Sequence, residues 1–157
     1  MSCAPCDGIL LLNSRIYEQI YVVNPILKCW LRIPPFPNLQ ARRVVDHQYT
    51  IACVPRTRKF KLFFVNVLKI SDAFWYVYYV LKIGVGNSWK EIARKEAPRQ
   101  RFICETLYNG GNDLYCRTTD EVIVIDVEKE TIFEIIHFPR CIILNKFYGW
   151  EIAFLAL

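Results

Sequence analysis

The fold is decided by the segment Tyr21-Val22-Val23-Asn24-Pro25-Ile26-Leu27-Lys28-Cys29-Trp30-Leu31-Arg32-Ile33, because its pattern occurs three times in the chain. An apolar run leads to a polar turn, and an aromatic residue, two further residues and an isoleucine follow. The later copies end at Trp89-Lys90-Glu91-Ile92 and at Phe133-Glu134-Ile135-Ile136. The aromatic positions are 59 and 44 residues apart, close to the length of about 40 to 50 residues typical of a propeller blade. The repeat predicts an array of β-sheets.

Composition agrees with this expectation. The chain has 157 residues, of which 54% are hydrophobic and 15% aromatic, enough for the core of one domain. Its β-branched and aromatic residues cluster in short runs separated by Gly, Pro, Asn and Asp, which is typical of strands and turns. We predict an all-β fold with antiparallel strands, namely a partial β-propeller of about three blades and the start of a fourth.

Turn residues divide the chain into units of short strands. The first unit is expected over Ile9–Leu12, Ile20–Val23 and Cys29–Ile33; the second over Tyr49–Val54, Phe60–Val67, Phe74–Ile83 and Trp89–Ala93; the third over Phe102–Leu107, Leu114–Arg117, Glu121–Val127 and Thr131–His137. Residues 38–48 and 94–101 are polar and basic, and they are predicted to be surface connections between units.

Residues 141–155 resemble the opening strands of a fourth unit. A row of three blades with a fragment leaves sheet faces and edges unpaired. We therefore expect residues 1–157 to be a single β-repeat domain, truncated at both ends.

The charge of +5 is unevenly distributed. Residues 1–101 carry 16 Lys and Arg against 6 Asp and Glu, whereas residues 102–157 carry 4 against 9. This asymmetry predicts a basic field on one part of the molecule and an acidic field on another. The start of the chain has no signal-peptide pattern and no apolar run of about 20 residues occurs, so we expect a soluble cytoplasmic or nuclear protein without membrane contact.

Few residues suggest chemistry. Cys3-Ala4-Pro5-Cys6 has the spacing of a redox pair or half a zinc site, but no second Cys or His pair completes it. The seven cysteines are expected to be mostly small buried hydrophobic residues. His47 is flanked by Asp46 in a predicted loop, and neither it nor His137 accompanies a nucleophile motif. We therefore predict no catalytic residue, no metal site and no cofactor.

The remaining patterns have simple structural interpretations. Gly84-Val85-Gly86 is expected to form a hairpin turn. The carboxylate pairs Asp120-Glu121 and Glu128 with Glu130 are expected to be solvated charges, although a glycosidase-like pair is an alternative. The repeated Trp30, Trp89 and Phe133 are expected to pack between blades, with base stacking as the alternative.

Several segments in order resemble the F-box associated domain of plant F-box proteins, a kelch-like domain. They are Cys6 to Leu12, Tyr21 to Pro25 with Trp30 and Ile33-Pro34, Trp89 to Ile92, Tyr108 to Tyr115, Val124 to Val127 and Phe133 to Pro139. The chain departs from the family pattern at Thr50 to Pro55, where the Gly and Asp of the usual strand end are missing. The F-box that precedes the domain in this family is not expected within residues 1–157.

The resemblance implies a kelch-like propeller that recognises the substrate of an SCF-type ubiquitin ligase. The expected partner is a target protein for ubiquitination, and a Skp-type adaptor is expected only if an F-box is encoded upstream. Other subunits carry out the ligase reaction in this family, so the chain is expected not to be an enzyme.

Two basic stretches are candidates for partner binding. Both follow a Trp-x-x-Ile strand, so they would emerge at equivalent places and offer a surface to an acidic partner; their residues are Arg42, Arg43, Arg94, Lys95, Arg99 and Arg101. A module for polyanions or nucleic acid is the alternative from another class, although nucleic acid is the less favoured partner. A non-functional truncated product is a further alternative.

Overall fold

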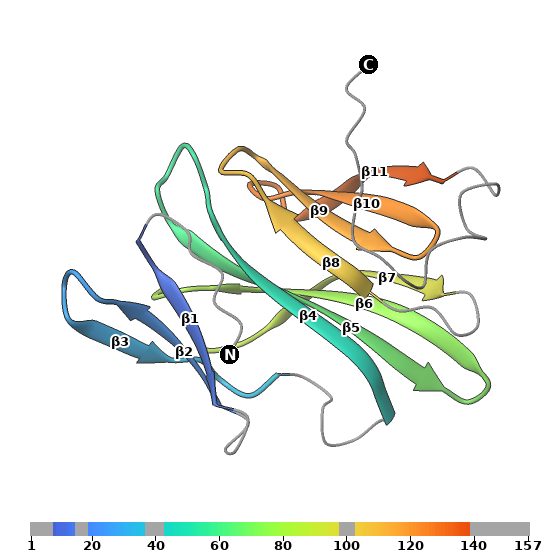
Figure 1. Cartoon of the computed structure of the whole chain (residues 1–157), viewed down its shortest axis with the longest axis horizontal. Coiled ribbons are helices and arrows are strands. Elements are labelled where there is room, and N and C mark those ends of the chain that lie inside the picture. The colour runs from blue at the N-terminus through green and yellow to red at the C-terminus, as the bar shows by residue number, and fades with distance from the viewer. Residues whose placement is uncertain (1–7, 15–18, 37–42, 98–102, 139–157) are drawn as a thin grey trace, which may run out of the picture.

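The computed structural model describes residues 8–14, 19–36, 43–97 and 103–138. Within these ranges every regular element is a β-strand, and the eleven strands form three antiparallel sheets (Figure 1). The described residues therefore include no helix that could cross a membrane.

Each sheet is a meander in which strands adjacent in sequence pair with one another. The first sheet contains β1 (Leu10–Ser14), β2 (Gln19–Asn24) and β3 (Cys29–Arg32); the middle sheet contains β4 (Arg43–Cys53), β5 (Phe60–Ile70), β6 (Ala73–Lys82) and β7 (Lys90–Ala97); the third sheet contains β8 (Ile103–Tyr108), β9 (Asp113–Thr118), β10 (Glu121–Asp126) and β11 (Thr131–His137). The all-β class and the antiparallel strands are confirmed, whereas the sheets do not close into a ring.

The three copies of the sequence repeat form one hairpin in each sheet, namely β2–β3, β6–β7 and β10–β11. Side-chain oxygens begin two of these turns. Oδ1 of Asn24 accepts hydrogen bonds from the backbone N–H groups of Ile26 and Leu27, and Oδ1 of Asp126 accepts one from Lys129. Such Asx contacts favour a tight turn, which explains why the repeat places a short polar residue there.

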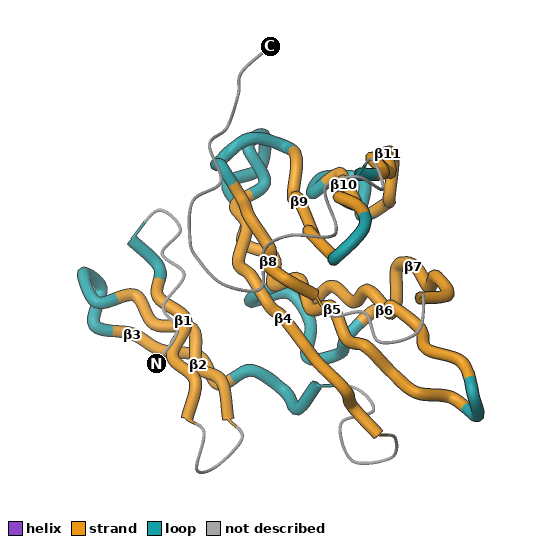
Figure 2. The backbone as a smooth tube through the Cα atoms, turned by 45° about the vertical axis from the view of Figure 1, so that its right-hand side comes forward, coloured by secondary structure: helices purple, strands orange, loops and turns teal. Residues whose placement is uncertain are grey.

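The middle sheet is buried on both faces, because the other two sheets pack against it from opposite sides (Figure 2). On one face, Ile51, Leu62 and Leu81 pack with Leu11 and Val22 of the first sheet. The other face forms the larger core with the third sheet; its members include Phe63, Val65, Tyr76, Tyr78, Leu114, Cys116, Ile123 and Ile125. This two-sided burial explains the almost continuous apolar sequence of β5 and β6.

The middle and third sheets are close together at one edge and diverge toward the other, and we call this pair of sheets the fan. Their first strands, β4 and β8, lie close together, whereas their last strands, β7 and β11, make only marginal contact. One end of this fan carries the turns β4–β5, β6–β7, β8–β9 and β10–β11, and we call it the hairpin end. Here Asn112 of the β8–β9 turn accepts backbone hydrogen bonds at its O and Oδ1 from Val127 and Glu128.

Two predicted connections are partly strand. The prediction of a connection over residues 38–48 was wrong from Arg43 onward, because β4 starts there and pairs with β5 as far as Lys69. The basic stretch that starts at Arg94 was also expected to be a loop, but β7 continues to Ala97 along β6. Long neighbouring strands supply backbone partners that polar composition does not reveal.

The expected burial of the repeated aromatic residues is only partly confirmed. Trp89 packs against Phe36 and Phe64, and its Nε1 donates a hydrogen bond to the carbonyl oxygen of Pro34 at 3.3 Å. Trp30 and Phe133, in contrast, are 68% and 54% exposed. They belong to the first and third sheets, each of which is covered by the middle sheet on one face only. The predicted fourth unit, from residue 141, lies outside the described residues.

We predict that Asn66→Leu stabilises the protein. Asn66 is fully buried between Phe64 and Leu68 on β5, and both polar atoms of its amide lack hydrogen-bond partners among the described residues. An unsatisfied buried amide costs about 1 to 3 kcal/mol, so urea denaturation should show a free energy of unfolding raised by about 1 to 2 kcal/mol.

Asn112→Leu is the matched control, because its amide oxygen accepts the backbone N–H of Glu128. This variant should lose about 1 kcal/mol. A destabilised Asn66→Leu protein would show that the amide of Asn66 is stabilising where it stands.

Candidate functional site

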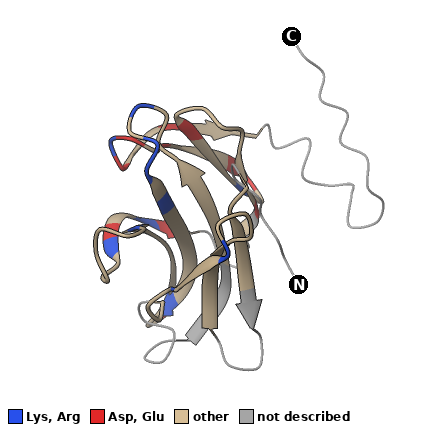
Figure 3. Cartoon of the chain, turned by 90° about the vertical axis from the view of Figure 1, so that its left-hand side faces the viewer, with Lys and Arg blue, Asp and Glu red and all other residues tan. Residues whose placement is uncertain are grey.

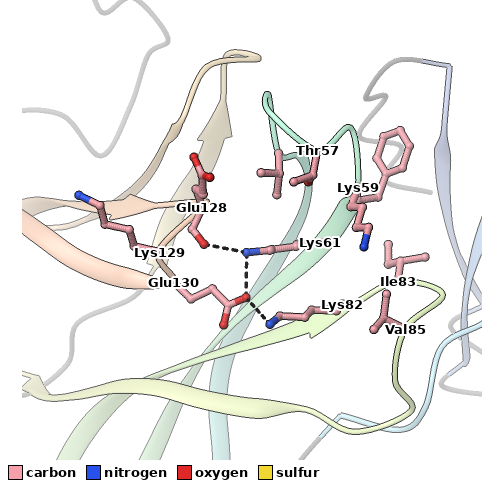
Figure 4. A pocket seen from close by; sticks show the side chains of 11 residues that line it. Thr57, Lys59, Lys61, Lys82, Ile83, Val85, Glu128, Lys129 and Glu130 are labelled. Atoms are coloured by element: carbon pink, nitrogen blue, oxygen red, sulfur yellow. Dashed lines mark hydrogen bonds and ion pairs between the residues drawn. The ribbon is translucent and has the colours of Figure 1, made fainter.

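A pocket of about 430 Å³ opens at the hairpin end, between the middle and third sheets (Figure 4). Its walls come from the turns β4–β5, β6–β7 and β10–β11 and from the adjoining strand ends. The lining residues are Val54, Thr57, Lys59, Phe60, Lys61, Lys82, Ile83, Val85, Glu128, Lys129 and Glu130. The pocket therefore combines apolar walls with six charged side chains.

Lys61 and Glu130 form the buried charged part of this pocket. The Nζ of Lys61 lies 2.8 Å from Oε1 of Glu130, and it also donates hydrogen bonds to the backbone carbonyl oxygens of Val127 and Glu128 at 2.8 and 3.1 Å. Both side chains are almost fully buried. Because the ammonium of a buried lysine needs such partners, this contact fixes the β10–β11 turn on the middle sheet.

Two further lysines surround the same carboxylate. Lys82 Nζ lies 3.3 Å from Oε1 of Glu130, and Lys90 Nζ lies 2.9 Å from Oε2. Burial alone would raise the pKa of Glu130, but the hydrogen bonds and charges of Lys61, Lys90 and Lys82 outweigh burial and lower this pKa to about 2. Glu130 is thus ionised at neutral pH and is surrounded by three positive charges.

The pocket has more positive than negative charge. Four lysines line it against two glutamates; outside the pocket, Lys129 is paired with Asp126 at 3.8 Å and Glu128 with Arg56 at 3.3 Å. Lys59 makes no ion pair with any described residue. In Figure 4 the amines of Lys59, Lys61 and Lys82 face the pocket, whereas Lys129 points away from it. The arrangement favours an anionic group next to an apolar one.

Of the six residues predicted from sequence, the three that the structure describes do not line this pocket. Arg42, Arg99 and Arg101 lie outside the described residues, and Arg43 is the first residue of β4. Arg94 and Lys95 are on β7, and their side chains bind carboxylates of this chain. Two guanidinium nitrogens of Arg94 donate to Glu91 at 3.0 Å, which raises the pKa of Arg94. Lys95 Nζ lies 2.6 Å from both carboxylate oxygens of Glu121.

The expectation that the carboxylate pairs are simply solvated was wrong for Glu121 and Glu130. Glu121 is buried, and besides Lys95 it lies 3.3 Å from Nδ1 of His137. Both glutamates join the third sheet to the middle sheet. Figure 3 shows acidic positions beside basic ones at several places, as such pairing requires. The burial of Glu121 and Glu130 was missed because the sequence does not show which strands of the middle sheet pack against these two residues.

The other candidate residues that the structure describes do not line the pocket. Cys3 and Cys6 lie outside the described residues, and His47 belongs to β4, so the loop predicted around it was wrong. Among the cysteines described, Cys53 and Cys116 are buried and Cys29 is exposed. No cluster of three or more potential metal ligands occurs in the part of the chain that the structure describes.

Comparison with known proteins gives no assignment: no protein-family model matches the chain, and no curated protein matches its sequence.

We predict that Glu130→Gln destabilises the protein by about 3 kcal/mol, the order expected when one partner of a buried ion pair is removed. The amide would leave the ammonium of Lys61 buried without a carboxylate. Glu128→Gln is the control, because its pair with Arg56 is on the surface and should contribute less than about 1 kcal/mol. Urea denaturation measures both values, and equal effects would contradict a special role for Glu130.

The lowered pKa of Glu130 also predicts a pH dependence. A carboxylate whose pKa is lower in the folded state stabilises the fold above its unfolded pKa of 4.5, and this stabilisation is lost as the pH falls toward 2. The difference in free energy of unfolding between wild type and Glu130→Gln should therefore shrink between pH 4.5 and 2. Denaturation curves measured across that range would contradict the assignment if the difference stayed constant.

Proposed function

We propose that this chain is a non-catalytic protein-interaction module, and that its hairpin-end pocket binds an acidic side chain of a target protein. The excess of lysine over glutamate in the pocket is the observation that carries the proposal. The resemblance to F-box associated domains supports the same class, because substrate recognition is the role of that domain.

The position of the lysines suits recognition of a carboxylate. Lys82 is held in place by Glu130, and its ammonium group is therefore oriented before a ligand arrives. The three N–H donors of Lys61 are already used by Glu130, Val127 and Glu128, so Lys61 contributes its positive charge and no further hydrogen bond. Preorganised charges bind with a smaller loss of side-chain freedom than charges on mobile side chains. Lys59 adds an ammonium that no described carboxylate neutralises. An incoming carboxylate would balance the positive charge of Lys59.

The apolar walls suggest what lies beside the carboxylate. Val54, Phe60 and Ile83 line the pocket together with the lysines. Interfaces bind through buried apolar anchors, and charged groups add specificity. We therefore propose a target segment in which Asp or Glu neighbours an apolar side chain.

The finer architecture is also part of the proposal. Contact between β4 and β8 with divergence of β7 and β11 is what radially arranged blades would produce, which supports a partial kelch-like propeller. Binding at the ends of hairpins is then consistent with the loop surfaces that such scaffolds present. In a ligase of the SCF type, the bound target would be modified by other subunits, and a Skp-type adaptor would bind through an F-box.

The test uses two fluorescein-labelled decapeptides of identical apolar sequence that carry a central Asp-Asp or Asn-Asn pair. We expect fluorescence anisotropy to show binding of the Asp-Asp peptide, and Lys59→Glu to weaken this binding about tenfold, equivalent to about 1.4 kcal/mol. Lys28→Glu is the control with the same charge change, because Lys28 lies in the β2–β3 turn away from the pocket. It should leave the affinity within about twofold of wild type.

Three results would contradict the proposal. Equal binding of the two peptides would remove the role of the carboxylate, and equal effects of the two lysine variants would remove the role of the pocket. Tighter binding of a labelled single-stranded oligonucleotide, with affinity falling steeply as salt rises, would instead support the polyanion-binding alternative.

A further inference from the structure

The outer face of the first sheet is apolar although no described sheet covers it. Strand pairing places Leu10, Val23 and Trp30 in one row across this face and Leu12, Tyr21 and Arg32 in the next. The alternate residues Leu11 and Val22 point to the middle sheet. Both faces of the first sheet are therefore apolar, as in strands that are buried on both sides.

The outer face of the third sheet has apolar residues beside charged ones. The inner positions Cys116 and Ile123 belong to the core with the middle sheet, so their neighbours along the strands point outward. Pairing places Leu107, Tyr115, Val124 and Glu134 in one outer row, and Glu105, Arg117, Val122 and Ile136 in another. Leu107 and Ile136 are 43% and 45% exposed. Exposed apolar groups on a sheet face indicate a surface that binds another layer.

The charges on these two faces are opposite. The described residues of the first sheet and its turns include Lys28 and Arg32 and no acidic residue. The outer face of the third sheet has four acidic residues, Glu105, Asp113, Asp126 and Glu134, against Arg117. Opposite charges around apolar centres are the complementarity expected of two surfaces that pack together. They cannot meet within one chain, because the middle sheet lies between the first and third sheets.

We propose that a second copy of this chain covers these faces, with the outer face of the first sheet of each copy packed on the outer face of the third sheet of the other. Such an arrangement is a two-fold symmetric, isologous interface, because each face of one copy contacts the other face of its partner, and the two contacts close the pair. Two chains of three sheets each contain six sheets, within the range of about four to eight that closes a radial arrangement. The predicted species is a closed pair of chains.

This inference is independent of the hairpin-end pocket. The pocket is lined by the facing sides and turns of the middle and third sheets, whereas the contact between copies uses the outer faces of the first and third sheets. A partner of another sequence would need an acidic face for the first sheet and a basic face for the third sheet. A second copy of this chain has both faces.

Sedimentation equilibrium of the full chain tests the proposal. The wild type should have twice the 18.5 kDa mass of one chain. Arg32→Glu and Glu134→Arg, made separately, should each raise the dimer dissociation constant at least tenfold, because each places like charges across the contact. The double variant Arg32→Glu with Glu134→Arg should restore dimerisation, since the charges are then exchanged between the two faces.

Arg56→Glu is the control: Arg56 is exposed at the β4–β5 turn, on neither outer face, and its variant should remain a dimer. Circular dichroism checks that every variant keeps its β-structure. A monomeric wild type at all concentrations, larger open assemblies, or failure of the double variant to restore the dimer would overturn the proposal. Loss of the dimer would leave acidic-peptide binding at the pocket unchanged, so the two proposals fail separately.

Discussion

Burial of the middle sheet on both faces is the constraint on which the rest of the structure depends. β5 and β6 lie between two other sheets, so their side chains meet protein on either side. Alternation of polar and apolar residues, which marks a sheet with one wet face, is therefore absent from them. Burying apolar area on both faces contributes about 25 cal/mol for each Å² removed from water, and a single sheet covered on one face would gain much less.

The same burial limits where charge can occur. Lys61 interrupts an apolar strand at a position that points toward the third sheet, and it is accommodated because Glu130 and two carbonyl oxygens reach it. Glu130 adopts a left-handed backbone conformation with φ of 61°, which disfavours residues other than Gly, Asn or Asp. Its ion pairs compensate for that conformation. The β10–β11 turn is thus held on the middle sheet by ion pairs. The pocket lies at this contact, where Lys61 and Lys82 surround Glu130.

The sequence predicted much of the fold because the strand signals are local. Apolar runs such as Phe60 to Val67 and turn residues such as Asn24-Pro25 indicate strands and turns from neighbouring residues alone. The start of β4 was missed because its pairing partner, β5, lies in another segment of the chain. The pocket was missed for a similar reason. Lys61, Lys82 and Glu130 come from three separate strands or turns, and only tertiary packing brings them to within 3.3 Å.

The repeated aromatic position shows how the same sequence signal leads to different environments. Trp89 is covered by Phe36, which comes from the segment between the first and middle sheets. The ring centroid of Phe36 lies 5.0 Å from that of Trp89 and 3.9 Å from that of Phe64, on which Phe36 stacks. No described segment covers Trp30 or Phe133 in this way. The repeat therefore specifies an aromatic residue at the start of the last strand of each hairpin, and the neighbouring layer decides whether that residue is buried. Exposure at this position occurs in the first and third sheets, each of which the middle sheet covers on one face.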